Sequence, residues 1–151
     1  MLRFDTNVRM DSAGAGNYGA RRGSRTHLGI DLIAAPEMIL LSPVNGIIVR
    51  FGYPYADSPL RLIEVRDVCN NLHRFFYVAP KEDYPVGTEV VVGDPIGIVQ
   101  DVTKRYPGSD MKNHVHYEIR DPTNNNVDPE QYYEAWDRFL GVFGRNIKDP
   151  E

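Results

Sequence analysis

From His114 to Arg120 the chain alternates strictly between polar and apolar residues, and this period of two predicts a half-buried β-strand. One face of the strand is apolar and is expected to point into the core: Val115, Tyr117 and Ile119. The other face is polar and is expected to meet water: His114, His116 and Glu118. Side chains two residues apart on a strand stand about 6–7 Å from one another. That spacing suits two histidines that flank one metal ion and its bound water.

Short apolar stretches separated by Pro, Gly, Asn and Asp fill the middle of the chain. They predict strands at residues 38–41, 46–51, 60–68, 74–78, 89–92 and 96–99. Residues 101–113 are rich in turn formers and predict a loop that leads into the histidine strand. Short strands with frequent turns are typical of a mainly antiparallel β-sandwich or barrel-sandwich-like fold, which we expect here as a single domain.

A helix is predicted near the C-terminus. Asp128 and Pro129 supply an N-cap and a proline at the first helical position. Apolar residues then recur at helical spacing: Tyr132, Trp136, Phe139 and Leu140. Such a stripe is usually buried, so the helix is expected to pack on the β-sheets.

The composition fits one compact domain, because 42% of the 151 residues are hydrophobic and 25% are charged. The net charge of −4 provides no basic field, so nucleic acid is not an expected partner. We interpret the local cluster of Arg21, Arg22 and Arg25 as a solvated loop. Cys69 is the single cysteine, which excludes an internal disulfide. No apolar run is long enough for a membrane span, and no signal peptide is visible.

A second cluster with metal-binding chemistry lies at HLGID, where His27 and Asp31 flank Gly29. In a fully extended chain their side chains would stand about 13 Å apart, whereas ligands of one tetrahedral zinc are about 3–3.5 Å apart. The backbone must therefore bend between them, and Gly29 permits the bend. His27, Asp31 and one histidine of the 114–116 segment would give three protein ligands and leave a position for water. That arrangement is typical of catalytic zinc, and spacing alone leaves open which histidine is the ligand.

The two clusters, HLGID followed by HVH, resemble the lysostaphin-like zinc endopeptidases of the LytM type, whose motifs are HxGxD and HxH. The likeness extends to the connecting segments GARRG, SPVNGIIV, PVGTEVVVGDPIG and VDPEQY, and so covers most of the chain. It implies a zinc cofactor held by His27, Asp31 and His116, with His114 as the catalytic acid or base.

The resemblance also implies a function and a division of the chain. The function is hydrolysis of peptide bonds in bacterial peptidoglycan by a metal-activated water, at the cell wall, whether extracellular, periplasmic or phage-delivered. The domain limits that it implies are an N-terminal extension at 1–13, a LytM-type peptidase domain at 14–133, and a C-terminal helix and tail at 134–151 that packs on the domain.

One position departs from the family pattern. The family places a further catalytic histidine in a YxH segment, and the matching residues here are Tyr77, Val78 and Ala79. His73 cannot replace it from the same strand, because six residues span roughly 20 Å in an extended chain. Either Tyr106, in the loop before HVH, acts as an auxiliary donor, or activity is reduced.

Two other classes of function stay open. The first is a noncatalytic LytM-like domain that binds cell wall or activates another hydrolase. The second is a lipoyl- or biotinyl-carrier-like module, suggested by the segment PVGTEVVVGDPIG and by Met111-Lys112. The carrier pattern requires a closing strand after the lysine hairpin, whereas Lys112 here lies next to HVH, so we expect no modified lysine.

Overall fold

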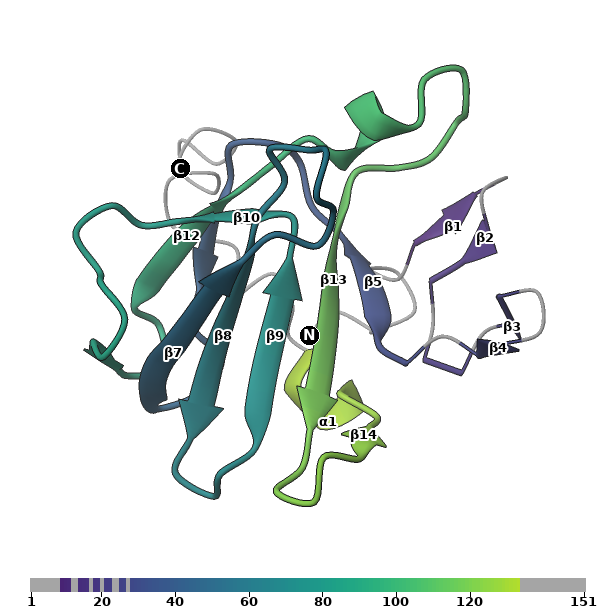
Figure 1. The fold of residues 1–151 in the computed structure, drawn as a ribbon. Coiled ribbons are helices and arrows are strands. Elements are labelled where there is room, and N and C mark those ends of the chain that lie inside the picture. Colours follow the sequence, from purple (N-terminus) through teal and green to yellow (C-terminus); the bar gives the residue numbers. More distant parts are fainter. Residues whose placement is uncertain are drawn as a thin grey trace, which may run out of the picture.

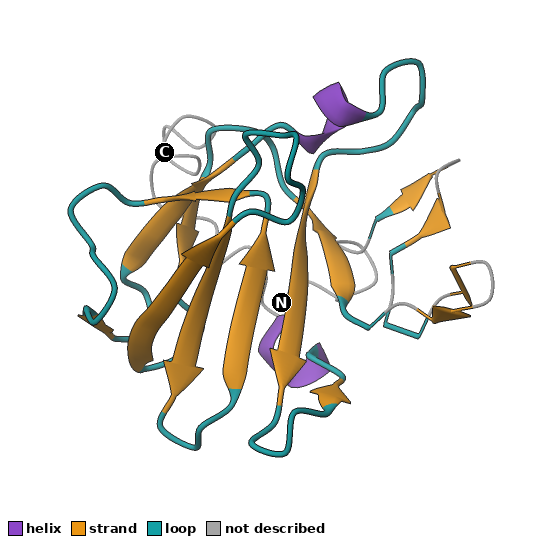
Figure 2. Ribbon diagram, viewed as in Figure 1, coloured by secondary structure: helices purple, strands orange, loops and turns teal. Residues whose placement is uncertain are grey.

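The computed structural model describes residues 9–11, 14–16, 18–19, 21–22, 25–26 and 28–133. Within these ranges nearly all regular structure is β-strand, as Figure 2 shows. The helical elements there are a 3₁₀ turn at Val102–Arg105 and the short helix α1 at Glu130–Tyr133. The prediction of a mainly antiparallel β protein is confirmed.

The larger of the two main sheets has seven strands (Figure 1). Its order is β11-β7-β8-β9-β13, and the far edge of β13 pairs with β5 along its first half and with β14 along its second. All the pairings are antiparallel. The strands are β5 (Ile30–Ile33), β7 (Gly46–Gly52), β8 (Leu62–Asp67), β9 (Leu72–Phe76), β11 (Glu89–Val90), β13 (His114–Arg120) and β14 (Asn126–Val127).

A three-stranded sheet of order β10-β12-β6 packs against the larger one through a shared core. Its strands are β6 (Ile39–Leu41), β10 (Val78–Pro80) and β12 (Pro95–Val99). Fully buried side chains from both sheets meet in that core: Leu32, Leu40, Ile48, Ile63, Val65, Phe75, Val78, Ile96, Val99, Val115 and Tyr117. Two small hairpins precede the two main sheets along the chain: β1 (Met10–Asp11) with β2 (Gly14–Ala15), and β3 (Arg21–Arg22) with β4 (Arg25–Thr26).

Strand positions were predictable but strand partners only in part. The expected pairing of 60–68 with 74–78 is found as β8 with β9. In contrast, β6 and β7 flank the turn at 43–46 yet lie in different sheets, and so do β11 and β12. Turn residues show where a chain reverses, but side-chain burial decides which sheet the next strand joins.

The predicted strand at 74–78 is interrupted at Tyr77. This residue has φ 73°, in the left-handed region that tyrosine rarely adopts. Its amide donates to the Arg61 carbonyl at 2.7 Å, outside the regular ladder. The turn at Tyr77 sends the chain from β9 in the larger sheet to β10 in the smaller one.

The predicted C-terminal helix is not confirmed: the described residues contain only the short helix α1, from Glu130 to Tyr133, directly after the predicted N-cap. The Asp128 carboxylate accepts from the amide of Glu130 at 3.1 Å, and Tyr132 packs against the core. Trp136, Phe139 and Leu140, which were expected to continue the helix, lie outside the described residues. Within the described part of the chain, no helix has the length and apolar character needed to cross a membrane.

His73 is fully buried between two polar partners. Its Nε2 lies 2.8 Å from Oδ2 of Asp67, and its Nδ1 lies 2.8 Å from the Tyr117 hydroxyl. A carboxylate only accepts, so Nε2 carries the proton and Nδ1 accepts from the hydroxyl. Burial lowers the pKa of His73, and the opposing contribution of Asp67 does not reverse the shift.

This buried histidine should make the fold sensitive to acid. Below the ordinary pKa of 6.5 the unfolded chain binds a proton that folded His73 excludes, so stability falls as the pH drops below that value. His73→Gln keeps a donor for Asp67 and an acceptor for Tyr117 but does not titrate. We expect it to remove up to about 1.4 kcal/mol per pH unit from the pH dependence of unfolding. Denaturant melts of both proteins at pH 7.5 and 5.5 would measure the free energy of unfolding at each pH. An equal loss of stability between these pH values in the wild type and His73→Gln would contradict the prediction.

Candidate functional site

Strand pairing brings together two of the three metal ligands that the sequence suggests. β5 and β13 run antiparallel with Asp31 directly opposite His116. As a result, Oδ1 of Asp31 lies 2.9 Å from Nδ1 of His116. Asp31 is only 3% exposed, so this carboxylate is removed from bulk water.

Gly29 contributes to this meeting in two ways. The chain bends at Leu28 and Gly29, as the sequence predicts. In addition, a Cβ at residue 29 would lie 2.5 Å from the Tyr117 carbonyl and 2.9 Å from Cε1 of His116. A side chain at this position would therefore push β5 away from β13, and glycine permits the close approach of the two strands.

Both ring nitrogens of His116 have carboxylate partners. Nδ1 faces Asp31, and Nε2 lies 2.9 Å from Oε1 of Glu118. The ring of Phe76 packs edge-on against the imidazole, with the two ring centroids 4.8 Å apart. Burial by itself would lower the pKa of His116, but the hydrogen bonds and charges of Asp31 and Glu118 outweigh burial and raise it.

His114 is oriented differently on the same strand. Its Nδ1 lies 2.8 Å from the Lys112 carbonyl, which only accepts, so Nδ1 carries the proton of the neutral ring. The unprotonated Nε2 then faces Asp31, 3.8 Å from Oδ2. Burial lowers the pKa of His114, partly opposed by Asp31, which favours the neutral ring near pH 7. The arrangement leaves His114 with a basic lone pair directed into the site.

Arg9 is a site residue that sequence reasoning missed. Its Nε and one terminal nitrogen donate to Oδ2 of Asp31 at 3.0 and 2.9 Å. Backbone bonds fix it there, because the Arg9 amide donates to the Asp31 carbonyl and the Gly16 amide donates to the Arg9 carbonyl. Arg9 is 3% exposed, so this is a buried ion pair. It leaves Oδ1 of Asp31 on the side of His116.

The polar face of β13 is more enclosed than the sequence predicts. His114 is 4% exposed and Glu118 is 8% exposed, whereas His116 between them is partly accessible. The prediction of a wet face was wrong because the charged neighbours cover it. Asp31 with Arg9 lies on one side, and Arg74 lies on the other. Alternation reveals which residues share a face, but it does not reveal what packs over them.

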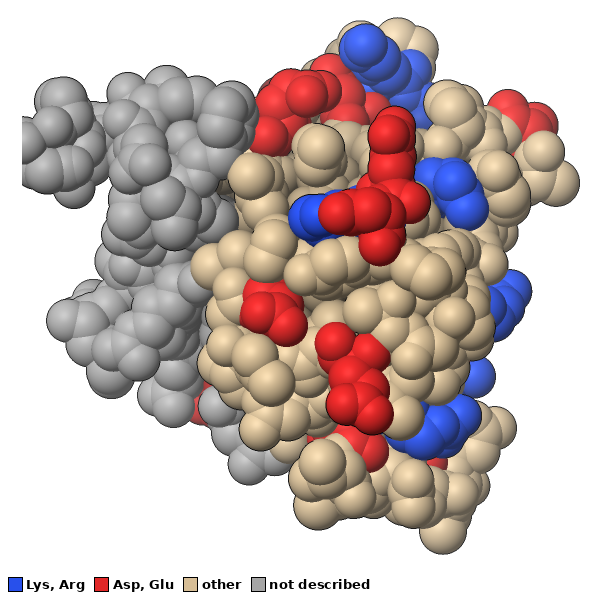
Figure 3. Space-filling model, turned by 90° about the vertical axis from the view of Figure 1, so that its left-hand side faces the viewer, with Lys and Arg blue, Asp and Glu red and all other residues tan. Residues whose placement is uncertain are grey.

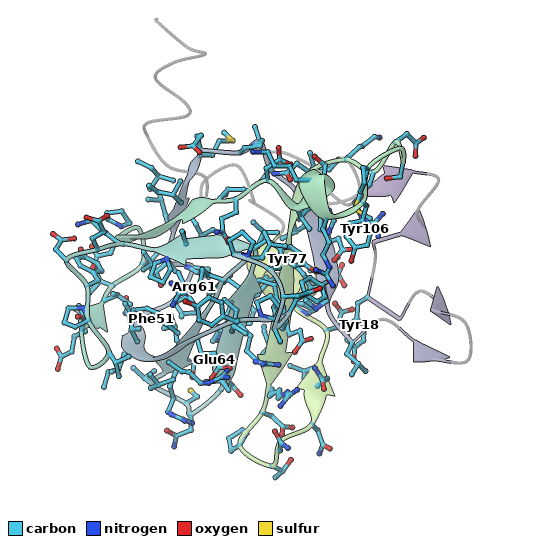
Figure 4. The ribbon with its side chains drawn as sticks, turned by 45° about the horizontal axis from the view of Figure 1, so that its top comes forward. Tyr18, Phe51, Arg61, Glu64, Tyr77 and Tyr106 are labelled. Atoms are coloured by element: carbon cyan, nitrogen blue, oxygen red, sulfur yellow. The ribbon has the colours of Figure 1, made fainter. Side chains whose placement is uncertain are left out.

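Three tyrosines form a hydrogen-bonded chain next to His114. The ring of Tyr77 packs edge-on against the imidazole of His114, with the two ring centroids 5.6 Å apart. The Tyr77 hydroxyl lies 3.1 Å from that of Tyr55, which lies 3.0 Å from that of Tyr106. Figure 4 shows Tyr77 toward the centre of the molecule and Tyr106 in the loop beyond it. Burial raises the pKa of Tyr77, and hydrogen bonding to Tyr55 adds to the shift. Tyr106, the suggested auxiliary donor, thus connects to His114 through two other tyrosines.

The remaining residues of interest lie around this centre. Ala79 is half-buried in β10 and pairs with Ile98 of β12. Cys69 is free and exposed. On the face shown in Figure 3, uncharged residues cover most of the surface, and acidic groups lie among them.

The donor set suits zinc. Oδ1 of Asp31 and Nδ1 of His116 lie 2.9 Å apart, close to the distance between two ligand atoms of one tetrahedral zinc, about 3–3.5 Å. Carboxylate oxygen and imidazole nitrogen are both common zinc ligands. The third suggested ligand, His27, lies outside the described residues, and among those described no group of three or more His, Cys, Asp or Glu has metal-binding geometry.

Comparison with known proteins identifies the family. No family model matches the chain. Leukocyte cell-derived chemotaxin-2 of Mus musculus is 30% identical over 127 residues, which cover 81% of this chain and 76% of that protein. The chain belongs to the leukocyte cell-derived chemotaxin-2 family. The Bos taurus chemotaxin-2 is 26% identical over 117 residues, covering 75% of this chain and 74% of its own length.

Among solved structures, several have the same fold, and they include a peptidase catalytic domain. The lysostaphin catalytic domain of Staphylococcus simulans has a TM-score of 0.61 at 17% identity, covering 85% of this chain and 93% of its own. The structure of LytU has a TM-score of 0.66 at 15% identity, covering 90% and 93%. A mutant catalytic domain of the prophage-encoded EnpA of Enterococcus faecalis has a TM-score of 0.60 at 22% identity, covering 83% and 91%. This member of the chemotaxin-2 family therefore has the lysostaphin-like peptidase fold.

Proposed function

We propose that the protein is a zinc-dependent endopeptidase that hydrolyses peptide bonds of bacterial peptidoglycan. The observation that carries the proposal is the convergence of Oδ1 of Asp31 and Nδ1 of His116 beside the unprotonated Nε2 of His114. Two ligand atoms and a nearby base, buried together, supply part of what metal-assisted hydrolysis requires, and His27 is proposed as the third ligand.

Each residue has a separate part in this proposal. His27, Asp31 and His116 would hold the zinc. Zinc, when bound, supplies the acidity that makes water a nucleophile near neutral pH, and it polarises the scissile carbonyl. His114 accepts a proton at Nε2, since its Nδ1 proton is committed to the Lys112 carbonyl. Burial keeps its pKa low, so the base form is present near pH 7.

A second candidate function is noncatalytic binding of cell wall or activation of another hydrolase. Two observations favour it: Ala79 stands where the resembling peptidases have a histidine, and the relatives carry the name of a chemotaxin. The carrier alternative is weaker, because Lys112 lies in the loop that leads into β13, two residues before His114, and not in a hairpin between two strands. An intact mass without a modified lysine would remove it.

The deciding experiment is cleavage of peptidoglycan. The purified protein is incubated with peptidoglycan from several wall types, with zinc and after chelation, and soluble fragments are identified by mass. The proposal predicts new peptide ends that depend on zinc. Zinc binding and wall binding without any fragments would establish the noncatalytic candidate instead.

His114→Ala should separate catalysis from metal binding. The variant loses the base but keeps Asp31 and His116, so we expect zinc content near that of the wild type and turnover at least about a hundredfold lower. His73→Gln, a change to a buried histidine outside the site, is the matched control and should cleave normally. If His114→Ala loses its zinc, His114 is a ligand and the roles of the two histidines are exchanged.

A further inference from the structure

A line of alternating charges crosses the larger sheet and ends on His116. Its members are cross-strand neighbours on β7, β8, β9 and β13: Arg50 opposite Glu64, Glu64 opposite Arg74, and Arg74 opposite Glu118. One oxygen of Glu64 accepts from both arginines at 2.9 Å. Arg74 then donates to Oε2 of Glu118, also at 2.9 Å. Figure 4 labels Glu64, the carboxylate shared by the two arginines.

The line is exposed at its Arg50 end and enclosed along the rest of its length. The Arg50 side chain is 52% exposed, whereas that of Arg74 is 14% exposed and that of Glu118 is 10% exposed. Solvent weakens ion pairs at the exposed end, and burial strengthens those next to the site. Glu118 is therefore held firmly by Arg74 through Oε2, while its Oε1 remains for the imidazole of His116.

We propose that Glu118 is a positioning residue of the zinc centre, which holds Nε2 of His116 so that Nδ1 is the atom presented to the ion. Nε2–H donates to Oε1 of Glu118 at 2.9 Å, and this bond determines which way the ring faces. Nδ1 is then directed at Oδ1 of Asp31. Arg74 prevents Glu118 from turning away, and Phe76 packs against the ring edge.

Asp31 is also held by a buried charged neighbour, Arg9. Arg9 binds Oδ2 of Asp31, which leaves Oδ1 toward His116. In each of these two residues one side-chain atom is held by a buried charged neighbour, and the other faces the second residue, with Oδ1 of Asp31 opposite Nδ1 of His116. Outer partners of metal ligands typically change affinity by about 10- to 100-fold when they are removed. This inference rests on the proposed zinc site.

The test compares three variants in the full chain. Glu118→Ala removes the partner of Nε2, Glu118→Gln keeps an oxygen acceptor without the charge, and Glu64→Gln changes a carboxylate of the same charge line that does not contact His116. Zinc affinity is measured by competition with a chelating dye. The ligating nitrogen of His116 is identified by long-range ¹H–¹⁵N NMR of the zinc-loaded proteins, and thermal melts establish folding.

We expect zinc affinity to fall about 10- to 100-fold in Glu118→Ala, less in Glu118→Gln and about twofold or less in Glu64→Gln. Ligation through Nδ1 should persist in the wild type, Glu118→Gln and Glu64→Gln, while Glu118→Ala should show ligation through Nε2 as well. Should Glu118→Ala fail to fold, the comparison of Glu118→Gln with Glu64→Gln decides.

Equal affinities for those two glutamine variants would overturn the positioning role while leaving the zinc site in place. Unchanged affinity and unchanged Nδ1 ligation in Glu118→Ala would do the same. A wild type that binds no zinc would overturn the proposed function and this inference together.

Discussion

Asp31→Ala is expected to abolish tight zinc binding and to lower the free energy of unfolding by about 3–5 kcal/mol. The first effect follows because Asp31 supplies Oδ1 opposite Nδ1 of His116. The second follows from Arg9, whose side chain is 4% exposed and whose guanidinium would be left buried beside the missing carboxylate. Bound zinc by elemental analysis and denaturant unfolding in the zinc-free state measure the two effects separately.

The double variant Arg9→Met with Asp31→Ala is the matched control. It removes both buried charges, so much of the stability should return while zinc binding stays absent. Stoichiometric zinc in Asp31→Ala would exclude Asp31 from the ligand set. Equal stability of the single and double variants would show that Arg9 finds another partner when Asp31 is gone.

The fold was largely predictable, because its strands carry their own signals. The alternation from His114 to Arg120 locates β13, and the inward residues Val115, Tyr117 and Ile119 are all fully or almost fully buried. What the pattern could not give is the division into two sheets. That division depends on Tyr77, where a positive φ takes the chain from one sheet to the other, and nothing in the side chain of tyrosine predicts such a conformation.

The centre of the site was predictable because its residues lie in two short motifs. The motifs HLGID and HVH suggested that Asp31 meets one of the two histidines, and the resemblance to the LytM-type peptidases assigned His116 as the ligand. The register of β5 with β13 places Asp31 opposite His116. The outer partners were not predictable. Arg9 lies 22 residues before Asp31 and Glu64 lies 54 residues before Glu118 in a different strand, so only strand pairing reveals them. Glu118 itself was placed on the correct face by alternation, but its contact with Arg74 was not visible in the sequence.

Ala79→His should raise peptidoglycan cleavage by about a hundred- to a thousandfold without changing zinc content. In the resembling peptidases a histidine at this position helps to stabilise the charge that develops on attack, and one missing donor costs about 2.7–4 kcal/mol of transition-state stabilisation. Ala79 lies two residues beyond Tyr77, whose ring contacts His114. Because Ala79 is half-buried, an imidazole there does not have to displace a core side chain. Initial rates of fragment release from the same peptidoglycan preparation measure the gain.

Ile98→His is the matched control for that gain, because Ile98 pairs directly with Ala79 and is 42% exposed. It introduces the same imidazole one strand away and should leave cleavage unchanged. A neutral Ala79→His in an already active protein, together with a damaging Tyr106→Phe, would show that the hydroxyl chain from Tyr106 through Tyr55 to Tyr77 supplies the donor instead. If neither the wild type nor Ala79→His cleaves, while both hold zinc and bind the wall, the histidine missing at position 79 is not the only catalytic group that the protein lacks. The protein then acts by binding, because the zinc site has been kept without the chemistry it serves in the peptidases.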